Sequence, residues 1–197
     1  MTPEGLLDVV RFFDRLATLP RTGWLLRGVT DVESIAEHSY GVAIVSMMLV
    51  DEARSRGVTV DGEKVLRMAL AHDAPEAFTG DIPMPAKTEA LSAALDEVEI
   101  MLLAKVLPPA LFEMVRESEA GVTLEARLVK AADKIQMLAK AVVYEEQRRG
   151  KLDEFWANAK NRRHMDLDFA KAVFAEIEKR ASAAGARVGT NMVQGRP

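Results

Sequence analysis

The segment HDAPEAFTGD, residues 72–81, carries four side chains that can bind a metal ion or transfer a proton. They are His72, Asp73, Glu76 and Asp81. The imidazole of His72 continues an apolar stripe that includes Val65 and Met68 at helical spacing, and such a stripe is expected to face a core. Ionisable groups at the edge of a core destabilise a fold, so their presence here indicates chemistry.

Two more polar side chains interrupt apolar helical patterns elsewhere in the chain. His38 shares a helix face with Val42, and Asp133 lies one turn from both Val129 and Met137. A carboxylate on an apolar face costs folding energy unless it is paired or ligates a metal. Three separate helices therefore each place a ligand-type side chain where an apolar one is expected.

Each of these residues also has a simpler explanation when it is taken alone. A single buried histidine is more often a hydrogen-bonded core residue, and Asp133 can pair with Lys130 or Lys134. Taken together, two imidazoles and two carboxylates form a mixed nitrogen and oxygen set suited to Mn²⁺, Fe²⁺, Co²⁺, Zn²⁺ or Mg²⁺. The predicted metal ligands are His38, His72, Asp73 and Asp133. His164, in the polar run NRRHMD, is expected to be a solvated surface residue.

Composition is that of a single globular domain. The chain has 197 residues, of which 49% are hydrophobic and 28% charged. Its net charge of −4 provides no basic field for nucleic acid or an anionic membrane surface. Cysteine is absent, and neither a signal sequence nor an apolar run of spanning length is visible. We therefore expect a cytoplasmic protein with no membrane or nucleic acid polymer as a partner.

Helical periodicity runs through most of the chain, so we predict an all-α fold, a single-domain bundle of six or more helices. Ser34 and Glu37 have the spacing of a capping box at the start of the second helix. A loop of about 15 residues precedes it, a length typical of functional loops. The predicted domain is 1–183, followed by a flexible tail, 184–197. The predicted helices are 3–18, 34–57, 61–72, 91–106, 110–118, 124–150, 152–156 and 165–183.

The order of the predicted ligands, with their flanking residues, resembles a known family. The flanks are PRTGWLLRGV, ESIAEHSYGVA, AHDAPEAFTGDIPMPAK and VKAADKIQ. Together they resemble the 5′-deoxynucleotidase branch of the HD-domain superfamily of metal-dependent phosphohydrolases. The resemblance spans roughly Leu16 to Tyr144, most of the domain.

The resemblance implies a reaction and a set of roles. Members of that branch hydrolyse deoxyribonucleoside 5′-monophosphates to nucleoside and phosphate with a divalent metal. The family's ligands correspond to the four residues named above, its catalytic carboxylate to Glu76, and the aspartate of its GD(I/L)P turn to Asp81. Either of these two carboxylates can orient the attacking water or protonate the leaving 5′-oxygen.

The loop before the second helix departs from the family pattern. An Arg-Trp pair is expected before the stretch that ends in Arg27, whereas here Arg21 lies one place early and Trp24 is displaced. Arg27 is the first candidate to hold the phosphate and Lys87 the second, although either can be a solvated surface charge. Trp24 either contacts the ribose at C2′ and disfavours ribonucleotides, or packs the loop onto the core.

The sequence thus predicts a metal-dependent phosphomonoesterase acting on (deoxy)nucleoside 5′-monophosphates. Two alternatives are another HD-type phosphohydrolase, acting on a different nucleotide or small phosphate ester, and a metal-binding regulatory module without turnover. The presence of Glu76 and Asp81 speaks against the module, because a structural ion does not require them. Met47, Met48 and Leu49 can serve a homodimer interface, but we expect them in the helix core.

Overall fold

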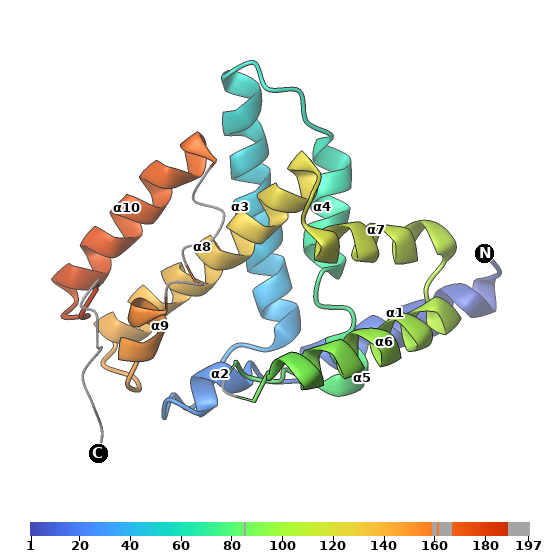
Figure 1. The fold of residues 1–197 in the computed structure, drawn as a ribbon, viewed down its shortest axis with the longest axis horizontal. Coiled ribbons are helices and arrows are strands. Elements are labelled where there is room, and N and C mark those ends of the chain that lie inside the picture. The colour runs from blue at the N-terminus through green and yellow to red at the C-terminus, as the bar shows by residue number, and fades with distance from the viewer. Residues whose placement is uncertain (85, 159–160, 162–166, 189–197) are drawn as a thin grey trace.

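The computed structural model of the chain describes residues 1–84, 86–158, 161 and 167–188 (Figure 1). Helices dominate this part of the chain, where no strand occurs and Pro20 and Ser34 form an isolated bridge. The all-α prediction is confirmed. The helices are α1 (Pro3–Asp14), the 3₁₀ turn η1 (Arg15–Ala17), α2 (Thr22–Leu25), α3 (Ile35–Ser55), α4 (Gly62–Ala71), α5 (Glu76–Thr79), α6 (Glu89–Val106), α7 (Pro109–Ala120), α8 (Leu124–Glu146), α9 (Asp153–Ala157) and α10 (Asp168–Ala183).

The long helices α3 and α8 form the centre of the larger core. They cross each other, α4 packs against both, and α10 lies on the outer side of α8 (Figure 1). Small residues such as Ala131 and Ala132 are fully buried on α8 and allow the helices to approach closely. Trp24 and Trp156 belong to this core although they lie on the short helices α2 and α9.

A smaller core joins α1, η1, α5, α6 and α7. It contains Phe12, Leu16, Ile35, Leu103 and Val115, and α1 and α6 lie side by side in Figure 1. The chain passes from the larger core to the smaller one at the end of α4. Because this crossing segment is residues 69–77, the residues with predicted chemistry lie where the two cores meet.

Several helix boundaries differ from the predicted ones. The first helix ends at Asp14 and continues as η1, and α4 ends at Ala71, so that His72 is its C-terminal cap residue. The expected loop before α3 contains the short helix α2. The long helix α8 ends at Glu146 rather than near Gly150.

The C-terminal part was also predicted differently. Helix α10 begins at Asp168, whereas its expected start at residue 165 lies outside the described residues, as does His164. Of the expected flexible tail, residues 184–188 are described, and Ala186 and Val188 pack against the larger core.

The expectation of a core role for the methionines of α3 was wrong. Met47 is 43% exposed and Met48 is 56% exposed, while Leu49 is buried. Helix α3 packs on α4 and α8 through its other face, which leaves these methionines outside. Within the described residues, no helix combines the length and the apolar character needed to cross a membrane.

The capping box at the start of α3 is present as predicted. The Ser34 hydroxyl accepts a hydrogen bond from the backbone N–H of Glu37 (3.1 Å), and the Glu37 carboxylate accepts one from the backbone N–H of Ser34 (2.7 Å). This box determines where the first turn of α3 begins, and His38 lies in that turn.

We predict that Ser34→Ala lowers the free energy of unfolding by about 1 kcal/mol, because it leaves an N-terminal backbone N–H of α3 without its acceptor. Urea denaturation of the metal-free protein measures the change. Ser55→Ala, at the exposed end of the same helix, is the matched control and should change stability by less than about 0.5 kcal/mol. Equal losses in the two variants would contradict the capping role.

Candidate metal centre and active site

Three helical elements bring the predicted ligands together. His38 projects from the first turn of α3, His72 from the C-terminal cap of α4, and Asp133 from the middle of α8. One ligand atom from each of these residues lies within 4.8 Å of the other two. Asp73 follows His72 in a turn and lies beside this cluster, with its Oδ2 3.6 Å from His38 Nε2. The structure therefore gathers all four predicted ligands in one place.

Both imidazoles present Nε2 to the centre of this cluster. The Nδ1 of His72 lies 2.8 Å from the carbonyl oxygen of Ala69, which can only accept, so this nitrogen carries the proton. The Nδ1 of His38 lies 2.6 Å from Oε1 of Gln136. Among the described residues neither Nε2 atom has a hydrogen-bond partner, although both are buried. Burial lowers the pKa of His72 and favours the neutral imidazole, which is the form that ligates metals.

The carboxylates face these nitrogen atoms. Asp133 Oδ1 lies 3.3 Å from His38 Nε2, and Asp73 Oδ1 lies 3.3 Å from His72 Nε2. An acceptor lone pair facing a carboxylate oxygen is unfavourable unless a cation or a proton lies between them. The donor set, two imidazoles and two carboxylates, therefore fits a divalent metal ion.

Both carboxyl groups are held ionised. Burial raises the pKa of Asp133, but Lys134, 2.9 Å from Oδ2, is the largest opposing influence, and this pKa lies well below its usual range. Burial likewise raises the pKa of Asp73, and Arg21, 3.5 Å from Oδ2, is among the groups that lower it on balance. The lysine partner expected for Asp133 is thus present, but it engages one oxygen and leaves the other facing His38.

Arg21 is the site residue to which sequence reasoning gave no role. Its Nη1 lies 3.5 Å from Asp73 Oδ2 and 4.0 Å from Glu76 Oε2. Burial lowers the pKa of this guanidinium, but the surrounding carboxylates outweigh burial and raise it, so the charge is permanent. Arg21 lies one position before the arginine of the family pattern, so the pattern did not assign it to the site. Its contacts with Asp73 and Glu76 do.

Asp81 holds the loop that carries Arg21. The backbone N–H of Thr22 donates a hydrogen bond to Asp81 Oδ2 (2.6 Å), and the Thr22 hydroxyl donates one to the carbonyl oxygen of Asp81 (2.5 Å). These contacts tie residues 59 positions apart in the chain. They fix the start of α2 against the loop that follows α5.

Glu76 lies outside the cluster and has a strongly shifted pKa. Burial, followed by repulsion from Asp73, raises the pKa of Glu76 to about 9, and Arg21 opposes this rise. Its Oε2 is buried without a hydrogen-bond partner in the described part of the chain. A carboxyl group in this environment is protonated near neutral pH when no cation is bound, so it can donate a proton.

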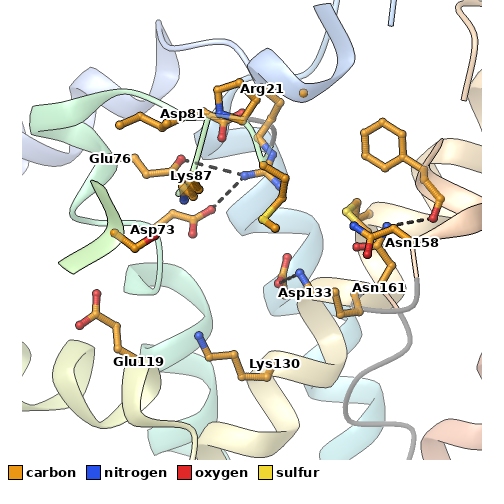
Figure 2. Close-up of a pocket in the computed structure, with 18 of the residues that line it drawn as sticks. Arg21, Asp73, Glu76, Asp81, Lys87, Glu119, Lys130, Asp133, Asn158 and Asn161 are labelled. Atoms are coloured by element: carbon orange, nitrogen blue, oxygen red, sulfur yellow. Dashed lines mark hydrogen bonds and ion pairs between the residues drawn. The ribbon is translucent and has the colours of Figure 1, made fainter. Parts of the chain in front are cut away.

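A cavity of about 990 Å³ is lined by Arg21, Asp73, Glu76, Asp81 and Asp133, among other residues. In Figure 2, Asp73 and Glu76 point toward Arg21. Asp81 and Lys87 lie beside them, and Lys87 lowers the pKa of Glu76. The cavity is large enough for a small ligand of nucleotide size.

The remaining predicted residues, Arg27 and Trp24, lie toward the α9 side of the cavity. The guanidinium of Arg27 forms an ion pair with Glu154 and lies 5.7 Å from the ring centre of Phe155. Trp24 is only 2% exposed, stacks on Phe155 with ring centres 4.3 Å apart, and donates its indole N–H to Glu33 (3.1 Å). This burial favours the alternative in which Trp24 packs the loop onto the core, and contact with the ribose stays a prediction.

Comparison with known proteins agrees with this geometry. The HD domain family matches residues 13–173. 5′-Deoxynucleotidase HDDC2 from Xenopus laevis is 31% identical over 189 residues, which cover 91% of this chain and 90% of that protein. A solved structure of a conserved hypothetical protein from Pyrococcus furiosus is 35% identical, with a TM-score of 0.76, and the match covers 89% of this chain and 99% of that one.

A third similar protein carries a functional description. It is a predicted metal-dependent phosphohydrolase from Magnetospirillum magnetotacticum, 26% identical with a TM-score of 0.69, and the match covers 92% of this chain and 91% of that one. The resemblance seen in the sequence is confirmed by the family match and by these relatives: the chain belongs to the HD domain family.

Proposed function

We propose that this chain is a metal-dependent phosphomonoesterase that hydrolyses nucleoside 5′-monophosphates, deoxy forms in particular, to nucleoside and phosphate. The observation that carries the proposal is the pair of buried Nε2 atoms of His38 and His72, which face Asp133 and Asp73, and these carboxylates line the same cavity as Arg21 and Glu76. The name of the curated relative from Xenopus laevis, a 5′-deoxynucleotidase, supports the substrate class.

The residues proposed to hold the divalent ion are His38, His72, Asp73 and Asp133. A divalent ion held by these residues would supply an activated water molecule near neutral pH and would offset the charge of the phosphate. The chain contributes the neutral imidazole of His72 and ionised carboxylates, which need no proton loss to bind the ion. The identity of the ion stays open among Co, Mn, Fe, Zn and Mg.

Arg21 is proposed to bind the phosphate, ahead of Arg27, which the sequence put first. Arg21 already lies against Asp73 and Glu76, next to the ligand cluster, and a guanidinium binds two phosphate oxygens at once. Lys87, from the loop after α5, adds a second cation on the same side of the cavity. Arg27 is already paired with Glu154 at the α9 side and is the second arginine candidate.

Glu76 is proposed to protonate the leaving 5′-oxygen. It is the buried carboxyl group whose raised pKa keeps a proton available, and it lies outside the ligand cluster. Asp81 is proposed to act by position, because its bonds to Thr22 hold the loop of Arg21. Hydrolysis transfers one proton to the departing oxygen and one hydroxyl group to phosphorus, so a group in the role of Glu76 is needed.

The alternative without turnover, a metal-binding regulatory module, leaves Glu76 unexplained, since a buried protonatable carboxyl group outside the ligand set destabilises the fold without aiding metal binding. Hydrolysis of another phosphate ester is tested by the substrate panel below. We further propose that residues 1–183 form the HD-type domain. A homodimer and a cytoplasmic location stay predictions.

We predict that the protein loses activity when it is dialysed against a chelator and regains it with Mn²⁺, Co²⁺ or Zn²⁺. Phosphate release from matched deoxy- and ribonucleoside 5′-monophosphates measures the activity and the sugar preference. Ion at 100 times its Kd should also stabilise the fold by about 2.7 kcal/mol. Metal binding without phosphate release from any nucleotide would favour the regulatory module, and release from a different phosphate ester would favour the other alternative.

The second prediction separates Glu76 from the ligands. Glu76→Gln keeps the shape but cannot donate an acidic proton, so kcat should fall by roughly 10²–10⁴ while the metal Kd stays nearly unchanged. Asp73→Ala, three positions earlier, should weaken metal binding itself. Metal titration of both variants, followed by kinetics at saturating metal, makes the comparison. If both lose metal to the same degree, the division of roles is incorrect.

The third prediction compares the two arginines of the cavity. Arg21→Ala should lower kcat/KM by roughly 10–10²-fold, the effect of losing hydrogen bonds to a charged group. Arg27→Ala removes an ion pair with an exposed glutamate and should cost less than about fivefold. Steady-state kinetics on one deoxynucleotide tests both. A larger loss in Arg27→Ala than in Arg21→Ala would indicate that Arg27 is the arginine that binds the phosphate.

A further inference from the structure

A chain of hydrogen bonds runs from His38 away from the cavity. The Nδ1 of His38 lies 2.6 Å from Oε1 of Gln136, and the amide nitrogen of Gln136 donates to Glu33 Oε2 (3.0 Å). The Glu33 side chain is 2% exposed and also accepts from the indole N–H of Trp24 and from Lys140 (3.3 Å). None of these residues other than His38 belongs to the ligand cluster.

The carboxylate of Glu33 allows only one orientation of the Gln136 amide. The Glu33 carboxylate accepts hydrogen bonds and cannot donate, so the NH₂ group of Gln136 must face it. The carbonyl oxygen of Gln136 then faces His38 and can only accept. A neutral His38 must therefore carry its proton on Nδ1, which leaves the lone pair on Nε2, the atom that faces Asp133 and Asp73.

A glycine in the middle of α3 makes room for this arrangement. A Cβ atom at Gly41 would lie 2.8 Å from Cγ and 3.1 Å from the amide nitrogen of Gln136. Glycine inside a helix destabilises the helix relative to alanine. Gly41 has a negative φ and makes no turn, so the close approach of Gln136 is what requires it here.

We propose that Gln136 is a positioning residue for the metal centre: oriented by Glu33, it holds His38 in the tautomer and ring orientation that direct Nε2 to the ion. The inference rests on the proposed metal site. It adds that Glu33 joins the ligand His38 to Trp24, so the loop carrying Arg21 and the metal centre share one buried carboxylate.

The test is metal affinity in the folded protein, measured on metal-free samples by titration with Zn²⁺ or Mn²⁺. Gln136→Met keeps the volume but removes both hydrogen bonds, and the Kd should rise by roughly 10–100-fold, the usual effect of removing a partner of a ligating histidine. Gln147→Met, the same change at the exposed C-terminal cap of α8, is the matched control and should leave the Kd within about twofold.

Two more variants distinguish positioning from packing. Gly41→Ala should strengthen the isolated helix yet raise the Kd, because it displaces Gln136. The double variant Glu33→Gln with Gln136→Glu keeps the donor directions at Trp24 and His38, although Lys140 loses its carboxylate partner: the amide at position 33 donates to the carboxylate at position 136, which accepts from His38. Its Kd should match the wild type within about threefold or be tighter. A Kd as weak as that of Gln136→Met would overturn the proposal.

The tautomer itself is observable without metal. Long-range ¹H–¹⁵N correlation spectra should show the proton of neutral His38 on Nδ1 in the wild type and distributed over both nitrogens in Gln136→Met. A wild-type His38 protonated on Nε2 would overturn the proposal. If the wild type binds no metal while the tautomers change as expected, the proposed function fails and the positioning of His38 stands.

Discussion

The rest of the site depends on one constraint: the acceptor atoms of two histidines and two aspartates face one another. Two imidazole lone pairs face two ionised carboxylates in a buried space. A single divalent cation at this point satisfies all of them at once. The surrounding donors therefore lie on the outer atoms of these side chains: Lys134 and Arg21 neutralise the carboxylates from outside, and the outer nitrogens of the imidazoles donate to oxygens.

The fold supplies this centre through elements that are well fixed. The capping box determines the first turn of α3, and α8 crosses α3 closely because small residues separate them. His72 and Asp73 lie where the chain passes from one core to the other, at the end of α4. The segment is anchored on both sides by buried alanines, which restricts the positions that its polar side chains can take.

The charges around Glu76 connect its proton to what occupies the cavity. Burial and Asp73 raise its pKa, and Arg21 and Lys87 lower it. A bound cation acts in the same direction as the two basic residues, while a phosphate dianion acts in the opposite one. A cation and a phosphate in the cavity therefore act in opposite directions on the pKa of Glu76.

The sequence by itself determined the helical class and the residues predicted to be metal ligands. Helical spacing reports which face of a helix a residue lies on, and His38, His72 and Asp133 each interrupted an apolar face. The capping box at Ser34 could also be predicted from the sequence, because it joins residues only three positions apart. The helix boundaries near residues 14, 71 and 146 were less accurate, because the last turns of a helix depend on its neighbours.

Only the tertiary structure decided which residues of different helices contact one another. Spacing along one helix does not reveal which other helix lies opposite, so Arg21 was left without a role and Met47 and Met48 were wrongly expected in the core. Gln136 and Glu33 lie 103 positions apart and carry no local pattern. Their hydrogen bond exists because α3 and α8 cross at Gly41, and a contact of that kind is set by packing between helices rather than by periodicity within one.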